Sequence, residues 1–228
     1  MTHPPARQTV APGCLPRHRH AQGYAAVVLA GAYEEAGDRG RRRVSAGDVV
    51  VHQPWDAHLN RTPRGAQVLN LPLAWPGPAA FGAAFGRVDD PDALARTAER
   101  DPGEAARRLL AEFRPAPAAS GDWPDRLAAA LAEVDALALR DWASALRLSP
   151  EHLSRGFGKV FGVTPQRFRW EARARAVLGD LAQSPLSLAE LALAHGFADQ
   201  AHMTRAVHAL SGRPPGAWRA STAFKTAG

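Results

Sequence analysis

The sequence of 228 residues has little of several residue types, and each shortage excludes a class of protein. It contains a single cysteine, Cys14, so no internal disulfide can form and the chain suits a reducing compartment. It has no run of eighteen apolar residues, which excludes a membrane-spanning helix. Its first residues lack the apolar stretch of a signal peptide. We therefore expect a cytoplasmic protein with no membrane partner.

Lysine is also scarce. Lys159 and Lys225 are the only lysines, so arginine supplies nearly all of the positive charge behind the net charge of +6. Up to Asp122 there are 15 arginines against 13 acidic residues (+2), and after it 13 basic against 9 acidic residues (+4). This modest bias favours nucleic-acid contact by the C-terminal half.

The last hundred residues contain one pattern twice, with the two copies offset by fifty positions. The first copy has Leu153-Ser154-Arg155, Gly162 and Pro165, and the second has Met203-Thr204-Arg205, Gly212 and Pro215. An alanine-rich helix and a tight turn precede each copy. A helix, a turn and a second helix with an outward arginine make a helix-turn-helix unit. Two units in tandem predict a protein that binds neighbouring grooves of DNA.

The helix boundaries support this organisation. Ser149-Pro150 and Thr164-Pro165 each place a hydroxyl N-cap before a proline, and Ser187 with Glu190 forms a capping box. The two units are expected at about 141–161 and 188–210, with one long helix over 165–181 between them. That helix fixes their separation, so the recognition helices can enter successive major grooves roughly 34 Å apart.

Hydrophobic periodicity assigns one face of each recognition helix to the interior. Leu153, Phe157 and Phe161 recur at helical spacing, as do Met203 and Val207. Arginine can bind guanine with two hydrogen bonds, glutamine suits adenine, and alanine suits a thymine methyl group. The residues expected to contact DNA are Glu151, Ser154, Arg155, Lys159, Gln200, Ala201, Thr204 and Arg205.

The second unit, from Ala192 to Gln200 and from Pro215 to Arg219, resembles the signature of the AraC/XylS family of bacterial transcription regulators. The first unit, with Leu153-Ser154-Arg155 and Phe161 to Pro165, is similar to that family's first helix-turn-helix. The resemblance implies double-stranded DNA as a partner, RNA polymerase as the contact of an activator, and no enzymatic activity. Two positions depart from it, because Val207 stands where the family usually has an aromatic residue and Ala174 where it has Leu or Met.

The N-terminal half shows a different pattern. Closely spaced β-branched runs at 24–29, 48–52 and 66–73, with glycine-rich turns between them, predict an all-β barrel or sandwich. Helices are expected at 92–100 and 101–113, with an apolar side that covers the barrel or meets a second subunit in a homodimer. The expected domains are a barrel over 1–75, a helical segment over 76–114, a linker over 115–122 and an all-α domain over 123–228.

Histidines of the barrel suggest a binding site. His18 and His20 point to the same face of a strand, and His58 can join them from a neighbouring strand. Three imidazoles suit zinc or another divalent transition metal. This arrangement resembles the cupin barrel, which commonly forms the sensor half of AraC-type regulators. Metal-binding cupins usually carry a glutamate four residues after the second histidine, where this chain has Tyr24.

Two interpretations of this half stay open. The histidines bind a metal, with His52 or Cys14 as an extra ligand, or they line a pocket for a small organic effector together with Tyr24, His52 and Trp55. Either ligand would change the affinity of the regulator for its operator through linkage. The alternative functions are a metal-dependent cupin enzyme fused to DNA-binding helices, and a constitutive DNA-binding dimer without an effector.

Overall fold

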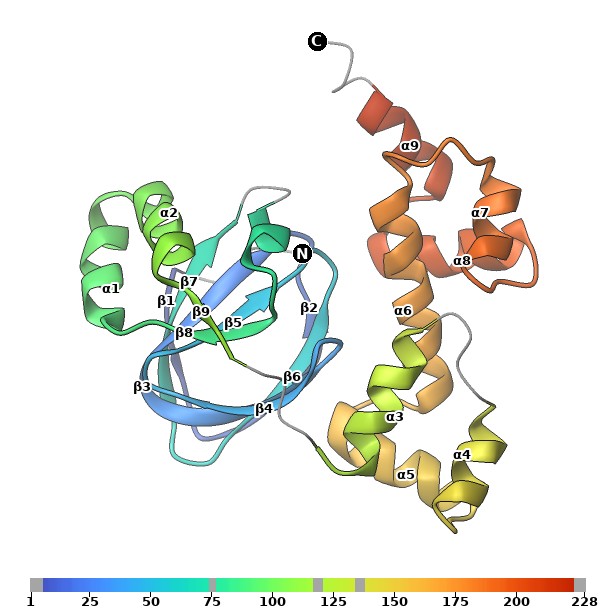
Figure 1. Cartoon of the computed structure of the whole chain (residues 1–228), viewed down its shortest axis with the longest axis horizontal. Helices are drawn as coiled ribbons and strands as arrows, with labels where there is room; N and C mark the ends of the chain where they lie inside the picture. Colours follow the sequence, from blue (N-terminus) through green and yellow to red (C-terminus); the bar gives the residue numbers. More distant parts are fainter. Residues whose placement is uncertain (1–5, 74–76, 117–120, 134–137, 224–228) are drawn as a thin grey trace. The chain divides into compact units, whose positions relative to one another are not determined.

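The computed structural model describes residues 6–73, 77–116, 121–133 and 138–223. The chain divides into two compact units, Met1–Gly121 and Asp122–Gly228 (Figure 1). The expected domain boundary at 75–76 and residues 117–120 of the expected linker lie outside the described residues. Among the described helices, none has both the length and the apolar character needed to cross a membrane.

The N-terminal unit is an antiparallel β-barrel, as predicted. Its strands are β1 (Arg7–Val10), β2 (Gly13–Arg19), β3 (Tyr24–Gly37), β4 (Gly40–Ser45), β5 (Asp48–His52), β6 (Ala57–Thr62), β7 (Ala66–Pro72), β8 (Phe85–Arg87) and β9 (Arg114–Pro115). The main path of hydrogen-bonded strands is β1-β7-β3-β5-β8-β9. Strands β4 and β6 pair with β3 away from this path, and β2 pairs with β6.

Strand β3 connects the two sides of the barrel because it pairs with four other strands. Its first half pairs with β5 and β7, and its second half pairs with β4 and β6. An irregularity in the register between Val28 and Ala30 shifts the alternation of side chains. Tyr24 and Val28 face the interior before it, and Tyr33 and Glu35 face the interior after it.

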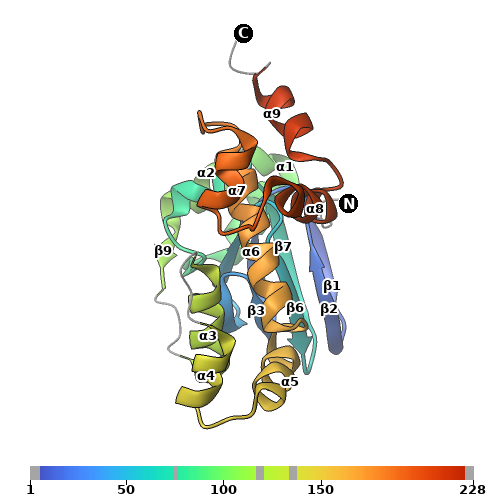
Figure 2. The same ribbon diagram turned by 90° about the vertical axis from the view of Figure 1, so that its right-hand side faces the viewer.

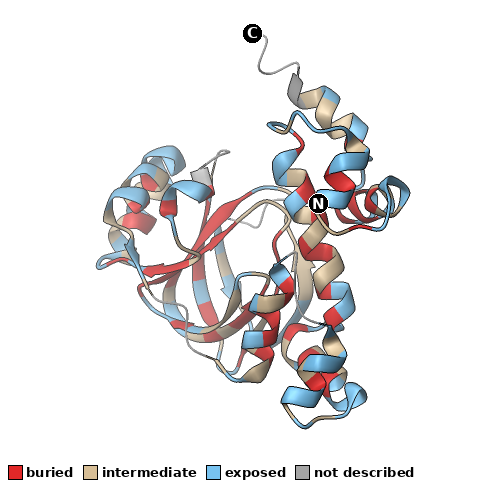
Figure 3. Ribbon diagram, turned by 45° about the vertical axis from the view of Figure 1, so that its right-hand side comes forward, coloured by how far each residue is buried: buried red, intermediate tan, exposed pale blue. Residues whose placement is uncertain are grey.

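Two short helices cover the outer face of the sheet. Helices α1 (Pro91–Arg100) and α2 (Pro102–Glu112) place Leu94 and Leu109 in one core with Val27 and Val49. Figure 3 colours the buried residues of both helices red. The first part of β3, from Tyr24 to Val28, and β5 are thus buried on both faces, which explains the continuous apolar runs in both. Of the two uses expected for these helices, the structure has the one that covers the barrel.

The helices expected at 92–100 and 101–113 are α1 and α2, but the segment over 76–114 is not helical throughout. After a 3-10 helix (Gly77–Phe81), this segment contains β8, and the expected linker begins with β9, which pairs with β8. Strands of three and two residues are too short to produce a recognisable hydrophobic alternation. They add an edge to the barrel that the sequence pattern does not indicate.

The C-terminal unit is all-α, as predicted, with two helix-turn-helix units joined by a long helix. Its helices are α3 (Trp123–Ala132), α4 (Leu139–Ala145), α5 (Pro150–Phe161), α6 (Pro165–Asp180), α7 (Leu188–Ala194), α8 (Gln200–Ser211) and α9 (Pro215–Ala223). Helices α3 and α5 pack near one end of α6, and α8 packs near the other (Figure 2). The first unit is α4–α5, and the second is α7–α8.

The sequence repeat is visible in the caps of the recognition helices α5 and α8. The side chains of Ser149 and Asp199 accept hydrogen bonds from the backbone N–H groups three residues later. Both helices end at a left-handed glycine, Gly162 and Gly212, each with φ of 74°. The predicted capping box of Ser187 and Glu190 begins α7. The two units therefore start and stop by the same local chemistry.

Helix α6 also holds the turn of the second unit. Arg173 donates a hydrogen bond from Nη1 to the carbonyl oxygen of Gly196 over 2.5 Å, and His195 Nε2 lies 2.9 Å from Asp180 Oδ2. Gly196 has φ of +70°, a region that favours glycine. A Cβ atom there would lie 2.9 Å from Arg173 Cζ. The turn thus depends on a residue with no side chain.

We expect Gly196→Ala to destabilise the C-terminal unit by about 1–2 kcal/mol, because alanine is strained at positive φ and its methyl group would displace Arg173. The matched control is Gly179→Ala in α6, where a Cβ atom meets nothing within 4 Å. Alanine should stabilise that helix position by about 0.5–1 kcal/mol. Urea unfolding followed by circular dichroism measures both, and equal stability of the two variants would contradict this account of the turn.

Candidate functional site

Helix α5 presents one polar and one apolar face. Leu153, Phe157 and Phe161 are at most 2% exposed, and the rings of Phe157 and Phe161 pack 4.7 Å apart between centroids. The residues expected at DNA lie on the other side of the helix. Of these, Glu151, Arg155 and Lys159 are exposed and Ser154 is half-buried.

Helix α8 repeats this division. Met203 and Val207 are fully buried, as is Ala174 of α6, so both departures from the family pattern lie in the core. Gln200, Ala201 and Arg205 are exposed and Thr204 is half-buried. All eight residues expected to contact DNA are therefore accessible or partly accessible on the two recognition helices, and their contact with DNA stays a prediction.

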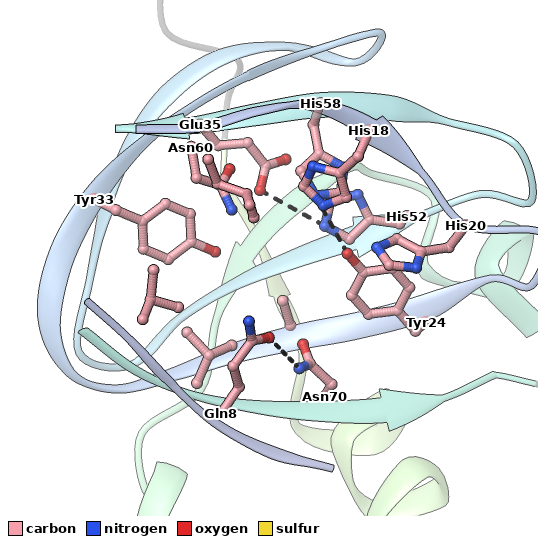
Figure 4. Close-up of a pocket in the computed structure, with 14 residues that line it drawn as sticks. Gln8, His18, His20, Tyr24, Tyr33, Glu35, His52, His58, Asn60 and Asn70 are labelled. Atoms are coloured by element: carbon pink, nitrogen blue, oxygen red, sulfur yellow. Dashed lines mark hydrogen bonds and ion pairs between the residues drawn. The ribbon is translucent and has the colours of Figure 1, made fainter. Parts of the chain in front are cut away.

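The barrel encloses a small polar cavity of about 40 Å³ (Figure 4). Its lining includes the polar residues Gln8, His18, His20, Tyr24, Tyr33, Glu35, His52, His58, Asn60 and Asn70. A volume of this size holds an ion and a few water molecules, whereas pockets for organic ligands of drug size span roughly 300–1,000 Å³. The cavity thus suits a small, polar occupant.

The structure brings the three expected histidines together. His18 lies directly opposite His58 in the pairing of β2 with β6, and His20 follows the end of β2. His18, His20 and His58 each have one ring nitrogen within 4.8 Å of a ring nitrogen of the other two. Asp38 helps to fix this pairing, because it accepts hydrogen bonds from Arg17 of β2 and from the backbone of Ala57 in β6.

A second group of ligand atoms shares His58. Glu35, His52 and His58 offer atoms that also lie within 4.8 Å of one another, and all three residues are at most 4% exposed. Glu35 Oε2 and His52 Nε2 are 3.6 Å apart. Sequence reasoning missed Glu35. In a regular strand the side chains of even-numbered and odd-numbered residues face opposite sides, but the register irregularity in β3 turns Glu35 toward the same interior as Tyr24 and Val28.

Burial sets the protonation of this group. It raises the pKa of the Glu35 carboxyl to about 8, with a smaller contribution from the charge of Asp56. It lowers the pKa of the His52 imidazole to about 3, and it holds the pKa of His58 well below the ordinary value. At neutral pH both imidazoles are neutral, which is the form that binds metals.

Comparison with known proteins identifies the C-terminal half. The sequence model of the helix-turn-helix domain family matches residues 142–221. This chain carries an AraC-type DNA-binding domain. Domains of this type occur in DNA-binding transcription regulators. No curated protein sequence matches the chain significantly.

Solved structures similar to the chain include other proteins of this kind. The C-terminal domain of AraT, a response regulator from Geobacillus stearothermophilus, has 21% identity and a TM-score of 0.41, over 46% of this chain and 88% of that one. The DNA-binding domain of AdpA in complex with a target DNA has 21% identity and a TM-score of 0.42, over 46% and 96%. ToxT from Vibrio cholerae O395 has 7% identity and a TM-score of 0.41, over 94% and 97%.

Two residues expected at the binding site of the barrel lie elsewhere. Trp55 is in the turn between β5 and β6 with φ of 68°, and it does not line the cavity. Cys14 is exposed on β2 and belongs to neither group of ligand atoms. Tyr24 and His52 do line the cavity, as expected, and their rings stack 4.4 Å apart. His52 therefore faces the same interior as His58.

We expect Arg205→Ala in the AraC-type domain to weaken binding to the cognate DNA by about 1–3 kcal/mol, with the loss confined to one base position. A binding series at fixed salt, with that position varied, measures this effect. The control Arg96→Ala removes an equally charged, exposed side chain from α1 and should leave the affinity within about twofold. An equal loss on every sequence would instead make Arg205 a phosphate contact.

Proposed function

We propose that this AraC-type regulator binds a specific operator and that a small ligand or metal ion in the barrel cavity changes its affinity for that operator. The AraC-type domain over residues 142–221 carries the first part of the proposal, together with the accessible side chains on α5 and α8. Arg155 and Arg205 stand at equivalent positions of the two units. They are the side chains best suited to distinguish bases in two successive major grooves.

The cavity of the N-terminal unit supports the second part. A barrel that served only as a scaffold would gain stability from an apolar interior, yet this interior buries Glu35, His52 and His58. Polar groups retained at such a position are typical of a binding site. A ligand can change the affinity for DNA only if it binds the two conformational states of the protein with different affinity. By linkage, the effector and the operator then change each other's binding affinity by the same factor.

The setting follows from this function. With chromosomal DNA as its partner, the proposed regulator would act in the cytoplasm, and as an activator it would also contact RNA polymerase. A homodimer would double the number of recognition helices on the operator. The helices α1 and α2 use Leu94 and Leu109 to cover the barrel, so the dimer contact would lie on another surface or include the exposed Leu110.

The test is a DNA-binding titration of the full chain at fixed salt, with fragments selected from genomic DNA. Selective binding should be at least about 10³-fold tighter than binding to unrelated DNA. Addition of Zn²⁺, then of a chelator, then of a panel of small metabolites, should change that affinity at least about fivefold for one ligand.

The matched control is the double variant Arg155→Ala/Arg205→Ala, which should lose selectivity and leave the barrel intact. Absence of selective binding under every condition would contradict the regulator. Selective binding that no ligand changes would instead support the constitutive DNA-binding protein.

A further inference from the structure

The buried group of Glu35, His52 and His58 has an unusual property. Among the described residues, Glu35 Oε2, His52 Nε2 and His58 Nδ1 are buried side-chain atoms without a hydrogen-bond partner. A buried polar atom without a partner carries its full desolvation penalty, so three such atoms on residues that line one cavity call for an explanation. A metal ion that accepts electron pairs from these residues would reduce the penalty.

The spacing of these atoms suits a metal ion better than a hydrogen bond. Glu35 Oε2 and His52 Nε2 lie 3.6 Å apart, which is too long for a hydrogen bond. Two ligands of a tetrahedral zinc ion, with bonds of about 2.0–2.1 Å, are roughly 3.3 Å apart. The ligand atoms of the three residues all lie within 4.8 Å of one another.

The outer histidines differ from this inner group in charge and surroundings. His18 and His20 are half-buried, and His18 Nδ1 lies 2.9 Å from the carbonyl oxygen of Pro16. The outer group of His18, His20 and His58 contains only imidazoles, whereas the inner group includes a carboxyl. A divalent cation in a buried site needs compensating negative charge, and Glu35 is the residue of the two groups that can lose a proton to supply it, so the inner group has the advantage.

We propose that Glu35, His52 and His58 bind a divalent transition metal in the barrel, and that His18 and His20 are not required for its binding. Two histidines and one carboxylate leave at least one coordination position open, which a water molecule or a small anionic ligand would fill. The claim that this ion is the effector rests on the proposed function, whereas the claim that the barrel binds it does not.

The test uses the full chain, stripped of metal with a chelator and then titrated with Co²⁺ and Zn²⁺. The Co²⁺ absorption spectrum reports the ligand geometry, and metal analysis after gel filtration gives the stoichiometry. Wild-type protein should retain about one Zn²⁺ per chain. Glu35→Gln and His52→Gln should each lower the metal affinity by more than about 100-fold, because each removes a direct ligand.

The matched control is His20→Gln, an equivalent change in the outer group, which should stay within a few-fold of the wild-type affinity. Thermal unfolding in the presence of chelator shows whether each variant keeps its fold, and Glu35→Gln preserves the shape of the side chain. The proposal is overturned if wild type retains no metal, if Glu35→Gln binds as tightly as wild type, or if His20→Gln loses the metal as well.

DNA binding is measured separately on the same preparations, so the two proposals fail in different ways. Metal binding through Glu35 with no effect on operator affinity would uphold the metal site and remove its role as effector. If an organic ligand changes the operator affinity of the metal-free protein, the regulator is upheld. If the titration of that protein also shows no retained Zn²⁺, the metal site is overturned.

Discussion

Two recognition helices can bind one DNA site together only if their separation is fixed, and helix α6 provides that constraint. It packs against α3 and α5 of the first half and against α8 of the second. Its side chains also reach the second turn, where Arg173 bonds to the carbonyl oxygen of Gly196 and Asp180 meets His195. A helix of this length is stiff, because a sharp kink would disrupt its backbone hydrogen bonds. The outward positions of Arg155 and Arg205 therefore have a defined relation within the unit.

The N-terminal unit buries two different sets of side chains on the two faces of its sheet. Strands β3 and β5 send alternate side chains into the core under α1 and α2 and into the barrel interior. The apolar side chains of the first set pack the sheet against the two helices. The second set leaves part of the interior to Glu35, His52 and His58, which contribute little to apolar packing. This division lets the barrel keep a polar cavity without losing its core.

Much of the C-terminal unit is predictable from the sequence because its signals are local. Caps such as Ser149 and Ser187, the spacing of Leu153 and Phe157, and the repeat at fifty positions each involve residues within a few turns of one another. The barrel depends on pairing between distant segments. The convergence of His18 with His58 is predictable from alternation, but Glu35 is not, because a single register irregularity in β3 reverses which side chains face inward. The prediction that Trp55 lines the pocket is wrong for a related reason, because Trp55 lies in a turn with positive φ, where side chains do not alternate as they do in a strand.

The central claim is that one chain places two recognition helices on one DNA site. Hydroxyl-radical footprinting of the full chain on its selected DNA tests this most directly, because it maps protected positions along each strand at single-nucleotide resolution. The account predicts two protected clusters on one face of the duplex, with centres about 10–10.5 base pairs apart. A single protected cluster would show that only one of α5 and α8 enters the major groove, and would contradict the role assigned to α6.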